Sequence, residues 1–289
     1  MKQKISIRFY NDREVRAVWD EESEQFFAIV DIINAITNSE NPRKYWSVLK
    51  TRLKKQNNEL ATNCSQLKLT AADGKNYLTD CIAQSHISEL AKVIPNKAAI
   101  AFLDWLTYSD STIDGQSRKK AYALFESNLL DTIPEGTVKG LQQIHSYLFG
   151  GLYDFAGQIR TKTISKGNTL FCLAEFLQDS LKAIEQMPEN TFDEIVDKYV
   201  EMNVAHPFME GNGRSTRIWL DLMFKKRMGL CVDWSKIDKN DYLQAMIESH
   251  LDSSRIRALL HGALTDKIDD REMFMKGIDY SYYYEQTDE

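Results

Sequence analysis

Apolar and polar residues alternate along the first part of the chain. Ile5, Ile7 and Phe9 are every second residue, and the residues between them would form the other face of a strand. This period of two is typical of a half-buried β-strand. Asn11 and Asp12 then form a candidate hairpin turn. We therefore predict a β-rich start built from three short pieces: ISIRFY, EVRAVW and FFAIVDII.

The hydrophobic pattern changes to a helical period at residue 42. In the segment RKYWSVLKTRLKK, apolar side chains fall at helical spacing and most Lys and Arg residues lie off this stripe. The stripe consists of Tyr45, Val48, Leu49 and Leu53. Two further short helices are predicted over residues 78–93 and 97–106. Strands followed by helices predict a small α+β domain over residues 1–108.

The stretch SDSTIDGQS at residues 109–117 is small, polar and turn-forming, which marks a domain boundary. We predict a linker over residues 109–119 and a second domain over residues 120–289. The second domain has helical periodicity, and Thr191 and Glu194 form a capping box that opens one of its helices. The fold class is therefore mainly α.

One segment interrupts the helical pattern of the second domain. Residues 157–171, GQIRTKTISKGNTLF, carry β-branched residues on both sides of a Lys-Gly-Asn turn. This composition predicts a small β-hairpin, and a plain surface loop is the alternative.

The composition is that of a soluble globular protein, with 43% hydrophobic and 27% charged residues. The four cysteines lie far apart without zinc-type spacing, so they are expected as reduced thiols in the cytoplasm. The chain start lacks the apolar core of a signal peptide, and its longest apolar run is too short to span a bilayer. We predict a cytoplasmic protein with no membrane contact.

Charge is distributed unevenly between the two parts. Residues 1–105 carry 15 Lys and Arg against 13 Asp and Glu, whereas the rest of the chain carries 21 against 29. The formal net charge is −6. Two units with different partners would produce such an asymmetry.

The chemically informative residues are concentrated in HPFMEGNGRSTR, residues 206–217. His206 follows the helix that opens at Thr191, and Pro207 disfavours helical geometry at the residue before it. Gly211 and Gly213 permit close approach of a ligand to the backbone. A second helix is predicted from about residue 214 to a C-cap at residue 229, so the loop precedes a helix N-terminus that can bind an anion.

Charged side chains surround this predicted anion site. Arg214 and Arg217 share one face near the helix N-terminus, where cations oppose the helix dipole unless an anion offsets them. A polyphosphate is the natural anion. Glu210 adds a carboxylate suited to Mg²⁺, and His206 is a titratable group able to take a proton from a hydroxyl.

Each of these residues has an ordinary structural explanation when taken alone. A histidine after a helix is more often a hydrogen-bond donor, GNG is a common loop, and arginine pairs usually serve solvated faces. Their occurrence together within twelve residues favours a functional site.

The segment resembles the signature of the Fic family, HPFx[D/E]GNGRxxR, at every specified position. The similarity runs from about residue 120 to the C-terminus and includes the upstream AGQIR segment. It implies a helical fold with a hairpin flap, in which a histidine deprotonates a hydroxyl that attacks the α-phosphate of ATP. The implied partner is a target protein that bears a Tyr, Thr or Ser hydroxyl.

The resemblance also implies a role for each motif residue. His206 would be the catalytic base and Glu210 the Mg²⁺ ligand. The anion hole would consist of Gly211, Asn212 and Gly213, with Asn212 on the α-phosphate. Arg214 and Arg217 would hold the β- and γ-phosphates of ATP.

The predicted hairpin is similar to the family's flap, which pairs with an extended stretch of the target by strand addition. Its residues are Ile164, Ser165, Lys166, Gly167, Asn168, Thr169 and Leu170.

The tail, GIDYSYYYEQTDE, places Ser281 and Glu285 four residues apart. It resembles the [S/T]xxxE[G/N] motif of an inhibitory helix, here predicted over residues 278–287, although Gln286 departs from the usual Gly or Asn. The implied glutamate pairs with the second motif arginine, Arg217, and blocks the γ-phosphate. A frayed acidic tail is the alternative.

Four tyrosines surround the tail motif: Tyr280, Tyr282, Tyr283 and Tyr284. Packing of the terminal helix is the plain interpretation, and burial of so much aromatic surface makes a homo-oligomer a candidate. The resemblance suggests a sharper hypothesis, in which the enzyme modifies one of these tyrosines and so releases inhibition.

Residues 5–106 resemble the BRO N-terminal domain of phage antirepressor-like proteins. The resemblance rests on RFYNDREVRAVWDEE, NPRKYWSVLKTRLKK and LKLTAADGKNYLTD. Such domains are associated with DNA binding, and residues 41–75 carry 8 Lys and Arg against 2 Asp and Glu. A basic face that only docks a protein is the alternative.

Three functions follow from these predictions. The first is an AMP transferase regulated by its tail. The second is a Fic domain that transfers another phosphate-containing group, although Glu210, Arg214 and Arg217 suit Mg-ATP. The third is a DNA-binding regulator whose Fic domain only senses nucleotide, which His206 opposes because binding alone needs no base.

Overall fold

The computed structural model describes residues 4–10, 12–19, 25–37, 39–71, 74–94, 98–167 and 169–286. The chain divides into two compact units, Met1–Thr112 and Ile113–Thr287. This division falls inside the linker expected over residues 109–119, but that linker is helical from Ile113 onward. None of the helices in the described ranges combines the length and apolar character needed to cross a bilayer.

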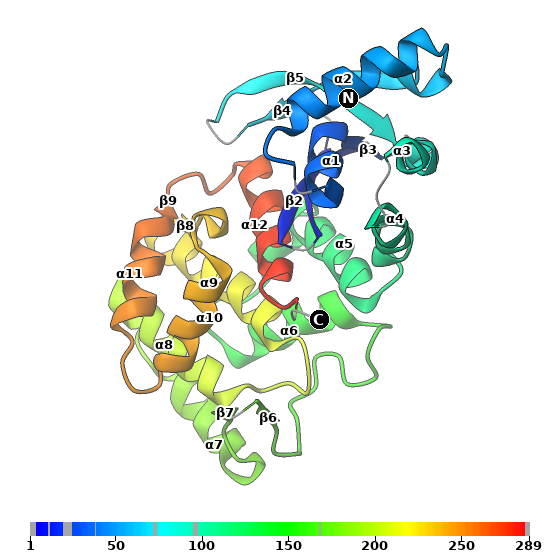
Figure 1. The fold of residues 1–289 in the computed structure, drawn as a ribbon. Coiled ribbons are helices and arrows are strands. Elements are labelled where there is room, and N and C mark those ends of the chain that lie inside the picture. Colours follow the sequence, from blue (N-terminus) through cyan, green and yellow to red (C-terminus); the bar gives the residue numbers. More distant parts are fainter. Residues whose placement is uncertain are drawn as a thin grey trace. The chain divides into compact units, whose positions relative to one another are not determined.

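Unit 1 is built on a five-stranded antiparallel sheet with the strand order β1-β2-β3-β5-β4 (Figure 1). Its strands are β1 (Lys4–Tyr10), β2 (Arg13–Trp19), β3 (Phe26–Ala28), β4 (Cys64–Thr70) and β5 (Asn76–Ala83). Its helices are α1 (Ile29–Thr37), α2 (Pro42–Lys55), α3 (Ile87–Val93) and α4 (Ala98–Ser109), with short 3-10 turns η1 (Glu59–Ala61) and η2 (Gln84–His86).

Helix α1 covers the sheet and forms the centre of the unit 1 core. It packs on β2 and β5 and also contacts α2 and α4. Ile29, Ile32, Ile33 and Ile36 are buried at helical spacing. The predicted β-piece FFAIVDII is therefore a strand only over Phe26–Ala28, since the isoleucine spacing fits one helix face better than one strand face.

Two other predictions in unit 1 need correction. The helix predicted over residues 78–93 is the strand β5 up to Ala83 and the helix α3 from Ile87, because β5 pairs with both β3 and β4. In α2 the residue Val48 is 65% exposed, and Trp46 lies in the core in its place. The helices predicted from residue 42 and over residues 97–106 are confirmed as α2 and α4.

Unit 2 is mainly helical. Its helices are α5 (Ile113–Glu126), α6 (Val138–Phe149), α7 (Ala174–Glu185), α8 (Phe192–Ala205), α9 (Asn212–Met228), α10 (Lys239–Glu248), α11 (Ser254–Ala263) and α12 (Arg271–Tyr283), with 3-10 turns η3 (Leu129–Thr132) and η4 (Trp234–Lys236). Its short strands are β6 (Ser165–Lys166), β7 (Thr169–Leu170), β8 (Cys231–Val232) and β9 (Leu264–Thr265).

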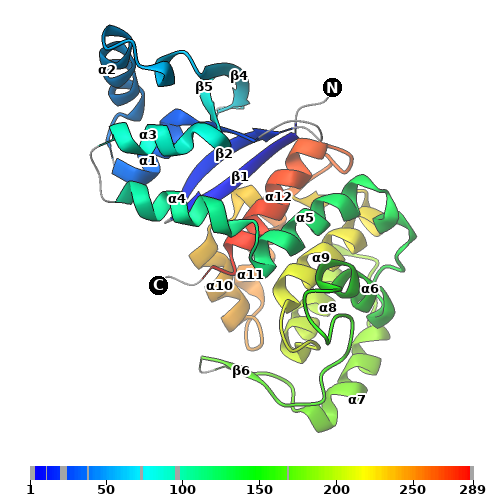
Figure 2. The ribbon, with the colours of Figure 1, turned by 90° about the vertical axis from the view of Figure 1, so that its right-hand side faces the viewer.

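Helix α9 runs through the middle of unit 2 and packs on α6, α8 and α12 (Figure 1). It is buried on most of its circumference, including Trp219, Leu220 and Phe224. Helix α12 also lies against α5, as Figure 2 shows. The β6–β7 hairpin confirms the predicted interruption of the helical pattern, but β8 and β9 form a second strand pair that the sequence did not indicate.

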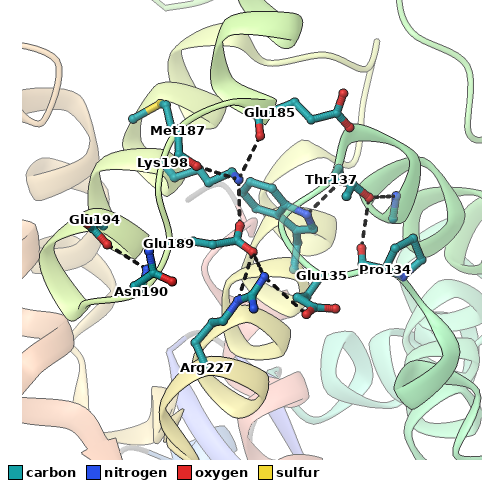
Figure 3. A network of polar contacts seen from close by, with 12 residues as sticks. Pro134, Glu135, Thr137, Glu185, Met187, Glu189, Asn190, Glu194, Lys198 and Arg227 are labelled. Atoms are coloured by element: carbon teal, nitrogen blue, oxygen red, sulfur yellow. Dashed lines mark hydrogen bonds and ion pairs between the residues drawn. The ribbon is translucent and has the colours of Figure 1, made fainter.

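A buried lysine fixes α8 to the segment that precedes it. Lys198 donates from Nζ to Glu189 Oε2 at 2.7 Å and to the Met187 carbonyl oxygen at 3.3 Å (Figure 3). Arg227 near the end of α9 donates from Nε to the other Glu189 oxygen at 3.1 Å. Since α8 and α9 flank the HPFMEGNGRSTR loop, this network holds the two helices that position it.

Candidate functional site

The loop between α8 and α9 begins at a residue in the left-handed conformation. His206 caps α8 with φ 48° and ψ 64°, and its N–H donates to the Met202 carbonyl oxygen at 3.0 Å. The predicted capping box at Thr191 is present at the other end of the same helix. A non-glycine residue in this region costs of order 1 kcal/mol and persists only where the surroundings fix it. Pro207 ends the helix, as predicted.

Arg160 provides hydrogen bonds that hold His206 in this backbone conformation. Its buried guanidinium donates to four carbonyl oxygens, those of His206 at 2.7 Å, Ala205 at 3.0 Å, Lys162 at 2.6 Å and Cys172. These carbonyls come from the start of the loop and from both sides of the β6–β7 hairpin. One side chain therefore ties the hairpin to the catalytic candidate.

His145 on α6 holds the far side of the loop. The Gly157 N–H donates to its Nδ1 at 2.9 Å, so the proton lies on Nε2, which donates to the Glu210 carbonyl oxygen at 2.8 Å. Its ring stacks on Phe208 with centroids 3.8 Å apart. Burial lowers the pKa of His145 to about 4, so the ring stays neutral and keeps this bonding pattern at pH 7.

The His206 ring has a defined tautomer. Nδ1 lies 3.2 Å from the Asn203 carbonyl oxygen, which can only accept, so Nδ1 carries the proton and Nε2 keeps its lone pair. The ring stacks on Phe171, which follows the hairpin, at 3.6 Å. Burial lowers the pKa of His206 to about 4. The arrangement can accept a proton at Nε2 at neutral pH.

Two glycines allow close approach at the start of α9. Gly211 has φ 80°, and a Cβ there would meet the Phe149 ring at 2.5 Å. A Cβ on Gly213 would meet Glu285 Oε1 at 2.2 Å and Arg217 Nη1 at 3.0 Å. The Glu285 carboxylate therefore lies directly over the first turn of α9.

That first turn has the properties of an anion site. The backbone N–H groups at the start of a helix have no partner within the helix, and the helix dipole adds positive potential. The Asn212 side chain is engaged with the loop itself, since it accepts from the Phe208 N–H and donates to the Phe208 carbonyl oxygen, both at 2.8 Å. Oδ1 and Nδ2 of this amide therefore each have a partner within the loop, and the Gly211 N–H donates to Glu210 Oε1 at 3.0 Å.

Arg214 lies between two carboxylates and two aromatic rings. Nη2 contacts Glu210 Oε1 at 2.8 Å, and Nη1 contacts Asp114 Oδ1 on α5. The guanidinium lies 4.9 Å from the Phe149 ring and 5.6 Å from the Tyr282 ring. Its side chain is only 4% exposed.

Arg217 is held by residues from α12 and the turn that follows it. Nε donates to Ser281 Oγ at 2.7 Å, and Nη2 donates to the Ser281 carbonyl oxygen at 2.7 Å and to Glu285 Oε1 at 2.6 Å. The rings of Tyr242 and Tyr284 lie 5.4 and 5.5 Å from the guanidinium. The Arg217 side chain is 2% exposed.

Glu285 is ionised in this environment. Burial alone would raise the pKa of its carboxyl, but Arg217 and Arg214 outweigh burial and lower this pKa to about 2. Lys166 of the hairpin adds a weaker contact, with Nζ 3.7 Å from Glu285 Oε2. Helix α12 begins earlier than the predicted range 278–287 and ends at Tyr283, so Glu285 lies in the closing turn.

The hairpin forms a separate exposed feature of the site. Ser165 pairs with Leu170 and Lys166 with Thr169, and the Phe171 N–H donates to the Ile164 carbonyl oxygen at 3.3 Å. Gly167 has φ 57° at the turn. Asn168 lies outside the described residues. The hairpin projects from the helices (Figure 2).

The residues present suit a magnesium ion that binds together with phosphates. Glu210 offers one carboxylate that is 56% exposed beside the anion position. Mg²⁺ in such sites takes one or two carboxylates and completes its shell with phosphate oxygens and water. Among the described residues no group of three or more His, Cys, Asp or Glu side chains could hold a metal by itself.

The four tail tyrosines differ in how far their side chains are buried. Tyr282 and Tyr284 are buried within the chain, and the Tyr284 hydroxyl donates to the carbonyl oxygens of Trp234 and Ile237 at 2.7 and 2.9 Å. Tyr280 and Tyr283 are partly exposed. Because the chain itself buries two of the four rings, the aromatic tail gives little reason for a second copy, and the homo-oligomer stays a prediction.

The structure thus brings together His206, the 210–214 segment, Arg217, Ser281 and Glu285, as expected from the sequence. It also adds residues that the sequence analysis gave no role, namely Arg160, His145, Asp114 and Tyr242. Only Arg160 carried a sequence signal, since it stands in the AGQIR segment.

A neutral histidine beside an arginine-lined helix N-terminus is a candidate site for phosphate chemistry. Residues 136–224, which lie within unit 2, match the model of the Fic/DOC family. This range includes α6, the hairpin and most of α9, but not α12.

Known proteins similar to this chain include several adenylyltransferases. Over 140 residues the chain is 31% identical to the protein adenylyltransferase VbhT of Bartonella schoenbuchensis. This match covers 44% of this chain and 29% of that protein. Over 169 residues it is 28% identical to the probable protein adenylyltransferase Fic of Salmonella typhimurium. This second match covers 52% of this chain and 84% of that protein. The chain therefore spans less than a third of the first relative and most of the second.

The fold is also similar to solved structures. The crystal structure of the BepC protein of Bartonella tribocorum with bound AMPPNP shares 20% identity and a TM-score of 0.45, over 58% of this chain and 90% of that chain.

Proposed function

We propose that this protein is a protein adenylyltransferase, which transfers AMP from Mg-ATP to a hydroxyl side chain of a target protein. The observation that carries the proposal is the position of the Glu285 carboxylate. It lies over the first turn of α9 and on Arg217, where an anionic group of a substrate would bind. The names of the similar proteins agree with this reaction.

The proposed reaction is an in-line displacement at the α-phosphorus of ATP. The target oxygen forms a bond to the α-phosphorus. The bond from this phosphorus to the oxygen that bridges the α- and β-phosphates breaks, and pyrophosphate leaves. His206 takes the hydroxyl proton at Nε2, which is unprotonated in the tautomer assigned by its contact to Asn203. The stacked Phe171 ring and the Arg160 bonds orient the imidazole.

The other residues would bind and orient the nucleotide. The backbone N–H groups of residues 211–213 would receive the phosphates, and Arg214 and Arg217 would contact the β- and γ-phosphates. Glu210 would hold Mg²⁺, which neutralises phosphate charge when bound. The exposed hairpin of residues 164–170 would pair with an extended segment of the target.

In this proposal Glu285 inhibits the enzyme. A γ-phosphate and the Glu285 carboxylate would compete for the same Nη2 of Arg217, since both are anions that a guanidinium binds by charge-assisted hydrogen bonds. Ser281 would support inhibition by holding Nε of the same guanidinium.

The test uses purified full-length protein with Mg²⁺ and ATP labelled at the α- or the γ-phosphate. We compare wild type, Glu285→Gly and His206→Ala, with and without cell lysate as a source of targets. We expect label on protein only from α-labelled ATP, more of it with Glu285→Gly and none with His206→Ala.

The alternatives predict different labelling. Protein labelled from γ-labelled ATP would mean transfer of another phosphate group. Nucleotide binding without any protein label in Glu285→Gly would favour a nucleotide sensor and contradict AMP transfer.

Self-modification of the tail is a second part of the proposal. Tyr280 and Tyr283 are the candidates, since Tyr282 and Tyr284 are buried. Mass spectrometry of ATP-treated protein should find a tail peptide heavier by one AMP, and an unmodified tail in protein that labels a target would contradict it.

Unit 1 has a candidate nucleic-acid surface on α2. Its exposed basic side chains are Arg43, Lys44, Arg52, Lys54 and Lys55, whereas Lys50 is paired with Asp80 at 2.6 Å. We expect salt-sensitive binding of duplex DNA that the double change Lys54→Gln and Lys55→Gln weakens. Lys182→Gln on α7 is the matched control, and equal binding by all three proteins would favour a protein-docking face.

A further inference from the structure

A second carboxylate outside the sequence motif contacts the nucleotide site. Asp114 lies in the first turn of α5, two residues into unit 2, and its Oδ1 contacts Nη1 of Arg214. Its side chain is 53% exposed, whereas the arginine is almost fully buried. Asp114 falls in the segment where the sequence predicts a linker.

Both terminal nitrogens of the Arg214 guanidinium contact a carboxylate. Glu210 contacts Nη2 and Asp114 contacts Nη1, while the rings of Phe149 and Tyr282 lie near the guanidinium. Nε is buried and has no hydrogen-bond partner among the described residues. A phosphate that binds Nη1 and Nη2 through the N–H groups held by Glu210 and Asp114 must therefore displace these carboxylates.

The two carboxylates differ in what they can do when nucleotide arrives. Glu210 has an alternative partner, since it is the carboxylate suited to Mg²⁺. Asp114 is half exposed, so it would pass into water when a phosphate takes its place on Arg214. Displacing Asp114 therefore opposes phosphate binding, whereas metal binding by Glu210 favours it.

We propose that Asp114 is a second inhibitory residue, which competes with the β- and γ-phosphates of a nucleotide for Arg214. The inference rests on the proposed function, because it takes Arg214 as a phosphate ligand. It is separate from inhibition by Glu285, since Asp114 lies on α5 and holds Arg214, whereas Glu285 follows α12 and holds Arg217.

A purely structural role for Asp114 makes a different prediction. An acidic residue in the first turn of a helix stabilises that helix through its dipole. Loss of that role would lower stability and would not strengthen nucleotide binding. Affinity for ATP relative to AMP therefore separates the two roles, because AMP lacks the β- and γ-phosphates.

The experiment measures dissociation constants of Mg-ATP and AMP by calorimetry for Asp114→Asn, made in wild type and in Glu285→Gly. We expect Asp114→Asn to bind Mg-ATP about three- to tenfold more tightly in both backgrounds, as for loss of a half-exposed ion pair. Affinity for AMP should stay within about twofold in the same proteins. Asp114→Glu, which keeps a carboxylate, should bind Mg-ATP as wild type does.

Asp179→Asn is the matched control, since it removes an exposed carboxylate paired with Lys182 on α7. Melting temperatures identify any variant that is poorly folded, and Asp114→Ser then serves as the second variant. Unchanged or weaker Mg-ATP binding in Asp114→Asn, or an equal gain for AMP, would overturn the inference.

Failure of the inference differs from failure of the proposed function. A gain in Mg-ATP affinity without AMP transfer would support Asp114 as a competitor and contradict the adenylyltransferase. AMP transfer with no effect of Asp114→Asn on affinity would leave the enzyme and overturn the inference.

Discussion

Replacement of Glu285 by Gln tests whether the pair with Arg217 is as strong as its geometry indicates. The carboxylate is 16% exposed, and its pKa falls from an ordinary 4.5 to about 2 in the folded protein. A difference of roughly 2.5 pKa units corresponds to about 3 kcal/mol of stabilisation, since each unit is worth about 1.4 kcal/mol. We therefore expect the free energy of unfolding of Glu285→Gln at pH 7 to be about 3 kcal/mol lower than that of wild type.

The sign of the pH dependence follows from the direction of the shift. A carboxyl with a lowered folded-state pKa contributes fully above its unfolded pKa of about 4.5. The contribution is lost as the pH falls from that value towards 2, where the protonated Glu285 resembles glutamine. The stability gap between wild type and Glu285→Gln should therefore be constant from pH 7 to 5 and should narrow towards pH 3.

Urea unfolding followed by helical circular dichroism measures this gap, because most helices belong to unit 2. Asp179→Asn is the control, and its exposed pair should contribute less than about 1 kcal/mol. A gap that stays the same from pH 7 to pH 3, or that is below about 0.5 kcal/mol at pH 7, would refute the reasoning. The same contact predicts that Glu285→Gly transfers more AMP than wild type, because the γ-phosphate then has no competitor on Arg217.

Other variants test the scaffold around the site. Arg160→Met should lower AMP transfer about a hundredfold while Mg-ATP affinity stays within about threefold, measured by labelled transfer and calorimetry, because only the loop geometry changes. Gly211→Ala should cost about 2–4 kcal/mol in urea unfolding, since its φ is positive and the new Cβ meets Phe149. Lys198→Met should lower the free energy of unfolding by about 2–4 kcal/mol in the same assay, because Glu189 loses one of its cationic partners. A loss below about 1 kcal/mol for Gly211→Ala or for Lys198→Met would contradict the contacts described.

Local chemistry explains what the sequence predicted well. The capping box at Thr191, the end of α8 at Pro207 and the C-cap at Gly229 each depend on neighbouring residues only. The tail contact of Ser281 and Glu285 with Arg217 was also expected, from a family motif. The cap and helix-end features need no knowledge of distant parts of the chain, whereas the tail contact needed the family motif.

Features that depend on distant partners were missed or misplaced. The β5 strand was predicted as helix because its pattern is ambiguous, and its pairing with β3 and β4 decided the outcome. The sequence places Asp114 in a predicted linker, since no local pattern indicates that it contacts an arginine one hundred positions later. Arg160 stands in the AGQIR segment, but its partners are backbone carbonyls, so no sequence pattern indicates what it contacts.

The electrostatics of α9 connect these observations. Two arginines near a helix N-terminus repel the positive end of the dipole and each other. In this structure Glu285 neutralises Arg217, while Glu210 and Asp114 neutralise Arg214, so the resting state already contains anions where phosphates would bind. Removal of a carboxylate without a substitute would leave a buried arginine uncompensated. A nucleotide, by contrast, brings its own negative charge, so exchange of carboxylates for phosphates leaves both arginines paired with anions. The same residues can therefore stabilise the resting protein and set the threshold that a substrate must exceed.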